Sequence, residues 1–147
     1  MDMGFNQYSD EQLVDIIYRT NFEFYELVYQ HDWLKNVFKV IDQKIITSQQ
    51  TDFMVQAFGG PKNYCGRSPD EAHPHIFVDE EMWEMRELLL RQAFIKVNVP
   101  ADIQERWLKI DNAFKSRIVM KSPEECKKRY NTDEIIIVPN PNKNRAA

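Results

Sequence analysis

The residues of this sequence best suited to chemistry are the segment Gly59 to Gly66, which reads Gly-Gly-Pro-Lys-Asn-Tyr-Cys-Gly, and His73. The glycines and the proline are expected to end a helix sharply, and the histidine follows at a fixed distance. An imidazole placed in this way can hold a metal ion. Further upstream, Gln50 interrupts an apolar helical stripe and Tyr25 belongs to an aromatic pair. Two hydrogen-bond donors can therefore face the same pocket from the opposite side.

Each of these residues also has an ordinary structural explanation. A buried glutamine costs about 1 to 3 kcal/mol unless it finds a partner, and a backbone or side-chain hydrogen bond would satisfy Gln50. Tyr25 fits a helical core with its hydroxyl bonded locally. His73 lies in a polar segment, where solvent exposure is common. No single residue decides between the two explanations.

Hydrophobic periodicity predicts the helices that position these residues. Ser9 and Gln12 form a capping-box pattern at the start of the first helix, Asn21 is the expected cap of the second, and Gly59 is the expected end of the third. Between Pro61 and Pro74 a long helix is excluded. The predicted helices are 9–20, 22–38, a third with the stripe Ile46, Gln50, Phe53 and Ala57, 79–97, and a last one opened by Pro100 with the stripe Ile103, Trp107, Ile110, Phe114 and Ile118.

Composition limits the class of protein. A chain of 147 residues with 43% hydrophobic content can form one domain with a sizeable core. A net charge of −4 argues against nucleic-acid binding, which needs a clustered positive field. The amino-terminal residues lack a signal-peptide pattern, and the longest aliphatic run, Ile135 to Val138, is far below the roughly 20 residues that a membrane span needs. Cys65 and Cys126 lack metal-ligand spacing, which suits reduced thiols and a cytoplasmic location.

The composition changes near residue 122. We expect a helical domain at 1–121 and a tail at 122–147 that is flexible or docks at the periphery. Within the tail, residues 134–141 could lie as a short extended segment on the helices or on another subunit. No function follows from this segment on sequence grounds.

Taken together, these elements resemble the truncated haemoglobins, with spacing closest to group I. The resemblance covers Phe24 to His73 without insertion or deletion and extends more weakly over residues 9–120. No single element is specific, but the combined pattern is. It consists of an aromatic pair, a later phenylalanine, a Gln-x-x-Phe element, the complete Gly-Gly-Pro-x-x-Tyr-x-Gly signature, the histidine and a later aromatic residue: Phe24-Tyr25, Phe38, Gln50 to Phe53, Gly59 to Gly66, His73 and Trp83.

The resemblance implies an all-α, two-over-two helical sandwich with a C-terminal extension. It implies haem b (iron protoporphyrin IX) with His73 as the iron ligand, and with Tyr25 and Gln50 as donors to a bound gas. The residues expected to contact the cofactor are Phe38, Ile46, Phe53, Met54, Tyr64, Arg67 and Trp83, with Phe58 completing an apolar wall and Arg67 or Lys62 pairing with a propionate.

The implied function is binding of dioxygen, nitric oxide and carbon monoxide, with conversion of nitric oxide to nitrate if a reductase partner supplies electrons. We expect a monomer or a dimer. The departures from the family pattern are Pro69, where a Met or Leu is usual, Pro74 directly after the histidine, a second imidazole at His75, and Arg86 in a region that is commonly apolar.

Two other interpretations stay open. A globin-like regulatory module without haem would use residues 122–147 to contact a partner. A mononuclear metal site would use His73 and His75 with Asp70, Glu71 or Asp79, which is permissible ligand chemistry.

Overall fold

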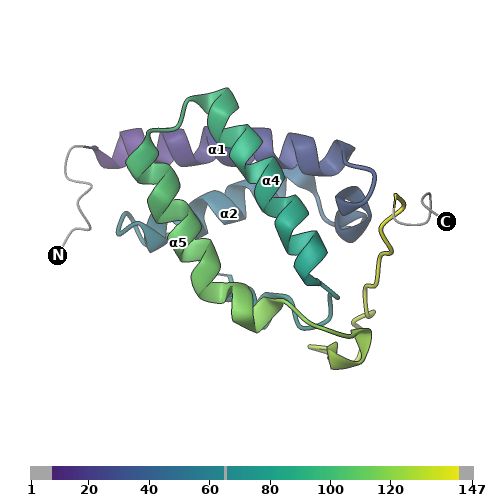
Figure 1. Cartoon of the computed structure of the whole chain (residues 1–147). Helices are drawn as coiled ribbons and strands as arrows, with labels where there is room; N and C mark the ends of the chain where they lie inside the picture. The colour runs from purple at the N-terminus through teal and green to yellow at the C-terminus, as the bar shows by residue number, and fades with distance from the viewer. Residues whose placement is uncertain (1–7, 65, 143–147) are drawn as a thin grey trace.

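The computed structural model describes residues 8–64 and 66–142, and this part of the chain is helical with one isolated β-bridge. The α-helices are α1 (Asp10–Gln30), α2 (Gln43–Ala57), α3 (Pro69–Ala72), α4 (Glu80–Val97) and α5 (Ala101–Ile118), and two short 3-10 helices are η1 (Leu34–Phe38) and η2 (Pro123–Glu125). Figure 1 shows α1 and α2 in one layer, crossed by α4 and α5 in the other. The predicted two-over-two helical sandwich is confirmed. None of the helices in the described part is long and apolar enough to cross a bilayer.

The first helix is longer than the sequence suggested. The capping box of Ser9 and Gln12 is present, with the Ser9 hydroxyl accepting from the Gln12 N–H at 3.1 Å. The expected break at Asn21 is wrong, because this side chain is buried within α1 and donates to the Thr51 hydroxyl of α2 at 3.2 Å. Because the Asn21 side chain is bonded to a residue of another helix, it does not bond to its own backbone and start a new helix. The first helix therefore continues to Gln30.

The second expected helix ends early and is followed by the separate turn η1. The His31 ring accepts N–H bonds from Trp33 and Leu34, both at 3.2 Å, which turns the chain after α1. Phe38, which the periodicity placed in the second helix, lies instead at the end of η1, after α1 has ended at Gln30.

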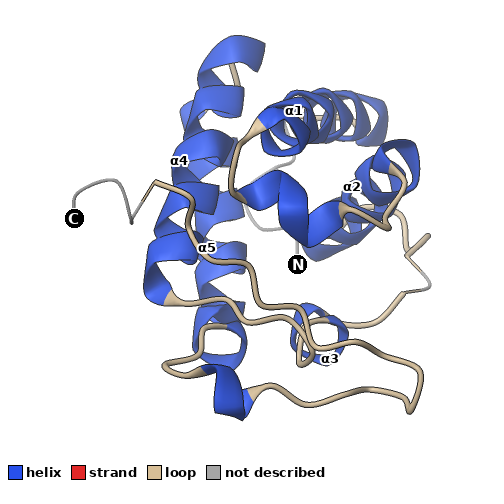
Figure 2. Cartoon of the chain, turned by 90° about the vertical axis from the view of Figure 1, so that its right-hand side faces the viewer, coloured by secondary structure: helices blue, strands red, loops and turns tan. Residues whose placement is uncertain are grey.

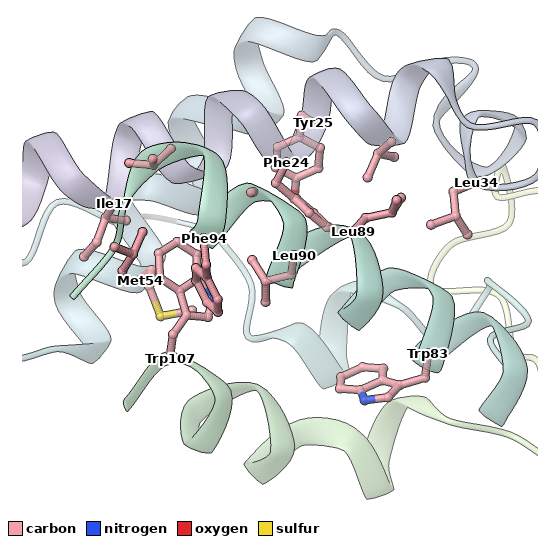
Figure 3. Packing of buried hydrophobic residues seen from close by; sticks show 14 of the residues in the cluster. Ile17, Phe24, Tyr25, Leu34, Met54, Trp83, Leu89, Leu90, Phe94 and Trp107 are labelled. Atoms are coloured by element: carbon pink, nitrogen blue, oxygen red, sulfur yellow. The ribbon is translucent and has the colours of Figure 1, made fainter. Parts of the chain in front are cut away.

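The core lies between the two layers. Figure 3 shows Ile17 of α1, Phe94 of α4 and Trp107 of α5 close together, and the Phe94 and Trp107 rings meet edge to face at 5.5 Å between centroids. Ile17, Phe94, Leu90 and Ile103 are almost inaccessible to solvent. Burial of each such side chain stabilises the fold by about 1.5 to 3 kcal/mol. This core fixes α1 against α4 and thereby sets the position of the aromatic residues of α1.

The predicted limits of the later helices are confirmed. Asp79 caps α4 by accepting from the Met82 N–H at 2.8 Å, and Asn98 ends it in the left-handed conformation with φ 58°. Pro100 precedes α5, as its lack of an N–H allows. After α5 the chain runs back past α3, as Figure 2 shows.

Candidate haem site

His73 ends the short helix α3 and has its imidazole held in one orientation. Its Nδ1 atom lies 2.6 Å from the carbonyl oxygen of Pro69. Because a carbonyl can only accept, Nδ1 carries the proton and Nε2 keeps the free lone pair. Burial lowers the pKa of His73, and the positive charges of Arg86 and Arg129 lower it further, although the bond to Pro69 opposes them. The ring is therefore neutral near pH 7, the form that binds a metal.

Pro69 and Pro74 do not disturb this arrangement. Pro69 starts α3, where a proline fits well, and contributes its carbonyl, which any residue could supply. Pro74 follows the last helical turn and prevents its continuation, so that His73 stays at the helix end. The two departures from the family pattern thus leave the histidine with a defined ring orientation.

His75, the second imidazole, lies in different surroundings. It is buried, and its Nδ1 atom has no hydrogen-bond partner within the described residues. Burial lowers its pKa, and the charge of Arg129 adds to this effect while Asp133 opposes it. The described side chains, which do not include Asp70, form no cluster of three or more His, Cys, Asp or Glu residues that could hold a metal ion. The alternative of a mononuclear metal site thus finds no support among them.

Tyr25 lies in the interior of α1 with its hydroxyl unused. The ring packs edge to face against Phe24, at 4.9 Å between centroids, and against Phe38 at 5.9 Å. The hydroxyl makes no hydrogen bond with any described residue, whereas the hydroxyl of neighbouring Tyr29 donates to the Ile41 carbonyl at 2.8 Å. Burial raises the pKa of Tyr25 strongly, with a smaller opposing effect of Arg86. The phenol therefore remains a proton donor at physiological pH.

Gln50 lies on a half-buried face of α2, together with Ile46, Phe53 and Ala57. Its carboxamide has no hydrogen bond to a described residue. On the same face, the Phe53 ring packs against the Tyr64 ring, with centroids 5.3 Å apart, and against the Phe114 ring of α5, with centroids 6.0 Å apart. This face is thus turned toward α5 and the segment after α2.

The more deeply buried face of α2 is the neighbouring one, where the sequence had indicated Met54 and Phe58 but neither threonine. It carries Thr47, Thr51, Met54 and Phe58. The two threonine hydroxyls donate to the carbonyls four residues earlier, at 2.8 and 2.7 Å, so they are buried with their hydrogen bonds satisfied. Figure 3 shows Met54 beside Ile17, Phe94 and Trp107, at the opposite end of the view from Trp83.

The signature segment begins with a turn at Gly59 and continues irregularly over residues 60–64. Gly59 has φ 93°, which favours glycine, and a side chain at Gly66 would come within 2.4 Å of the Tyr64 hydroxyl oxygen. That hydroxyl donates to the Arg67 carbonyl. Cys65 lies outside the described residues, and Cys126 is a free thiol. The turn thus sets the Tyr64 ring against Phe53.

Arg67, expected near a propionate, is exposed and lies over the Tyr130 ring of the C-terminal segment, at 4.8 Å. Trp83 is buried on α4, and the Arg86 guanidinium lies 4.9 Å from its ring centre. Lys62 is exposed.

An ion pair of Arg86 on α4 and Asp111 on α5 was missed by sequence reasoning. Arg86 Nη1 donates to Asp111 Oδ2 at 2.9 Å, and the guanidinium also lies 5.7 Å from the Phe24 ring centre. Burial by itself lowers the pKa of Arg86, but the Asp111 carboxylate outweighs it and the net pKa is raised. The available signal was Asp111 itself, which follows Ile103 and Trp107 at four-residue steps and so occupies a buried position of α5.

No hydrogen bond joins Tyr25, Gln50 and His73 to one another. Arg86 connects two of them electrostatically, since its charge lowers the pKa of both Tyr25 and His73. Aromatic rings lie close to these residues: Phe24 and Phe38 pack against Tyr25, and Phe53 lies on the same face of α2 as Gln50.

A two-layer helical sandwich with an oriented neutral histidine after the signature turn defines a globin. The chain belongs to the bacterial-like globin family, whose model matches residues 11–122. A Group 1 truncated hemoglobin from Tetrahymena pyriformis is 42% identical over 50 residues, which are 34% of this chain and 41% of that relative. The matched part thus spans less than half of the relative's length.

A crystal structure of a mutant truncated hemoglobin from Tetrahymena pyriformis, in the Fe(III) form, has the same fold. Its TM-score is 0.67 at 21% identity, over 78% of this chain and 100% of that chain. The resemblance to the truncated haemoglobins is thereby confirmed. Membership of this family implies haem-based binding of a gas.

Proposed function

We propose that this chain binds haem b through the Nε2 atom of His73 and holds a diatomic gas next to Tyr25 and Gln50. The observation that carries the proposal is the bond of His73 Nδ1 to the Pro69 carbonyl. It selects the tautomer in which Nε2 can bind a metal, and the lowered pKa reduces competition from protons. When bound, haem would supply an iron that can bind a diatomic gas.

Tyr25 and Gln50 are also suited to a haem site. The Tyr25 hydroxyl and the Gln50 carboxamide have no partner within the described part of the chain, so both are free to donate to a ligand that carries partial negative charge. The apolar rings of Phe38 and Phe53 lie nearby, Phe38 against the Tyr25 ring and Phe53 on the same face of α2 as Gln50. The Arg86–Asp111 ion pair is less expected in a haem site, because it brings two charges close to an aromatic interior.

We further propose that the protein converts nitric oxide to nitrate. Nitric oxide, dioxygen and one electron balance to one nitrate ion, so a reductase partner must supply that electron. Tyr25 and Gln50 would hold the ligand by hydrogen bonds and keep their own protons, because the Tyr25 pKa is raised far above neutrality. We place this activity in a compartment with reduced thiols, consistent with free Cys126.

Absorption spectra of the purified protein, oxidised, reduced, and reduced under carbon monoxide, test the first proposal. We expect the bands of a haem protein and a shift with carbon monoxide. His73→Ala should abolish or severely weaken haem retention, whereas His75→Ala, the matched control, should keep it. A colourless protein that cannot be reconstituted with haemin would instead favour the regulatory module without haem.

A further inference from the structure

The chain after α5 lies against the residues that follow His73. Most of this segment, residues 123–142, is beyond the part matched by the family model. Figures 1 and 2 show it running from the end of α5, past α3, toward the far end of α1. Its backbone bonds to the segment after His73 are Met120 N–H to Val78 O at 2.8 Å, Lys127 N–H to Pro74 O at 2.7 Å, Ile136 N–H to His75 O at 2.8 Å, and Phe77 N–H to Ile136 O at 2.9 Å.

Ile136 is the central contact of this segment. It forms a parallel β-bridge with Ile76, and its side chain packs on the hydrophobic core. The adjacent Ile137 points outward and is half exposed. Pairing at Ile136 therefore fixes the path of the chain two to four residues after His73.

Arg129 reaches the residue on the other side of the histidine. Its Nη1 atom donates to the Ala72 carbonyl at 3.4 Å. Its Nε and Nη2 atoms donate to the two carboxylate oxygens of Asp133, at 2.9 and 3.1 Å. This fork holds the guanidinium in place, so that residues on both sides of His73 are bonded to the same C-terminal segment.

The far end of the segment is anchored near α1. The indole Nε1 of Trp33, a buried residue just after this helix, donates to the Val138 carbonyl at 2.8 Å. The segment is thus fixed to one layer of the sandwich and to the histidine loop. By contrast, α3 has only four residues and too few internal hydrogen bonds to be stable by itself.

We propose that the C-terminal segment, residues 120–138, positions His73 for the iron, with Arg129 and Ile136 as its positioning residues. The inference rests on the proposed haem binding. The segment holds the carbonyls of Ala72, Pro74 and His75, and so limits how far the imidazole can tilt or withdraw. Loss of these bonds lets the histidine loop move, and haem leaves faster.

The test compares Ile136→Pro with Ile137→Pro in the full-length chain. Proline at 136 removes the N–H that bonds to His75, whereas the Ile137 N–H makes no bond with a described residue, so this neighbour is the matched control. Arg129→Ala is a second variant, with exposed Lys128→Ala as its control. Haem release to an excess of a competing apoglobin should be about tenfold faster in Ile136→Pro and Arg129→Ala, and unchanged in both controls.

A second measurement separates positioning from general stability. The iron–histidine stretching band of the reduced, ligand-free protein should shift or broaden in Ile136→Pro and Arg129→Ala only. Folded variants with wild-type release rates and an unchanged band would overturn the proposal. If the wild type itself takes up no haem, the proposed function fails and this inference falls with it. If the wild type binds haem but the variants release it at the wild-type rate with an unchanged band, only the positioning role is rejected.

Discussion

Arg86 Nη1 and Asp111 Oδ2 are 2.9 Å apart and join α4 to α5 beside the rings of Phe24 and Trp83. The Arg86 side chain is 32% exposed and that of Asp111 is 10% exposed, so the pair is shielded on the carboxylate side. Removing one partner from such a pair leaves a charge without compensation, while replacing both is far less costly.

This asymmetry gives a double-mutant prediction. Asp111→Ala and Arg86→Met should each lower the free energy of unfolding, by about 1 to 3 kcal/mol after allowing for solvent screening of the arginine. The combined variant should lose much less than the sum of the two. Urea unfolding of the haem-free proteins measures all three values. Strict additivity would show that the two charges do not stabilise each other.

Sequence patterns predicted the helix starts and ends that depend on residues close together along the chain. The Ser9 capping box, the end of α2 at Gly59 and the start of α4 near Asp79 are local, and all are confirmed. The break at Asn21 was wrong because its partner, Thr51, comes from another helix. The position of Asp111 on the buried stripe of α5 indicated that it needs a partner, but the identity of Arg86 as that partner depends on how α4 crosses α5.

The same reasoning applies to the candidate site. The sequence marked His73, Tyr25 and Gln50 as candidates from their spacing. It could not indicate the Pro69 bond that orients the imidazole, because this depends on the turn made by α3. Pro69 departs from the family pattern in its side chain, whereas the bond to His73 uses its backbone carbonyl, which every residue type has.

Tyr25→Phe should affect ligand release without affecting the fold. Its hydroxyl makes no hydrogen bond within the described residues, so the haem-free variant should unfold within about 0.5 kcal/mol of the wild type. A lost hydrogen bond to a ligand with partial charge should speed dioxygen release by roughly 10- to 150-fold. Stopped-flow release measures this rate, and nitrate formation with an added electron donor should fall with it.

Tyr29→Phe is the control for that experiment. It removes the bond to the Ile41 carbonyl and should cost about 1 kcal/mol of stability while dioxygen release stays unchanged. Equal release rates in Tyr25→Phe and the wild type would mean that the Tyr25 hydroxyl has no part in ligand binding.

Gly66→Ala should destabilise the signature turn. The added methyl group would lie 2.4 Å from the Tyr64 hydroxyl oxygen, so the ring must move, at a cost of about 1 to 3 kcal/mol. In a Tyr64→Ala background the clash is absent, and Gly66→Ala should cost little more. Thermal unfolding of the four proteins gives the comparison. A similar loss in both backgrounds would assign the effect to the backbone at Gly66.

The stability of the haem-free protein should decrease as the pH falls below about 6.5. Burial lowers the pKa of His73 and of His75 from an ordinary value of 6.5. Below that pH the unfolded chain binds protons that the folded chain does not, so protonation favours unfolding. Urea unfolding at pH 7.5 and pH 5.5 should show the loss, and His75→Asn should reduce it, because one of the two groups is then absent. An equal pH dependence in both proteins would show that His75 is not a buried neutral imidazole.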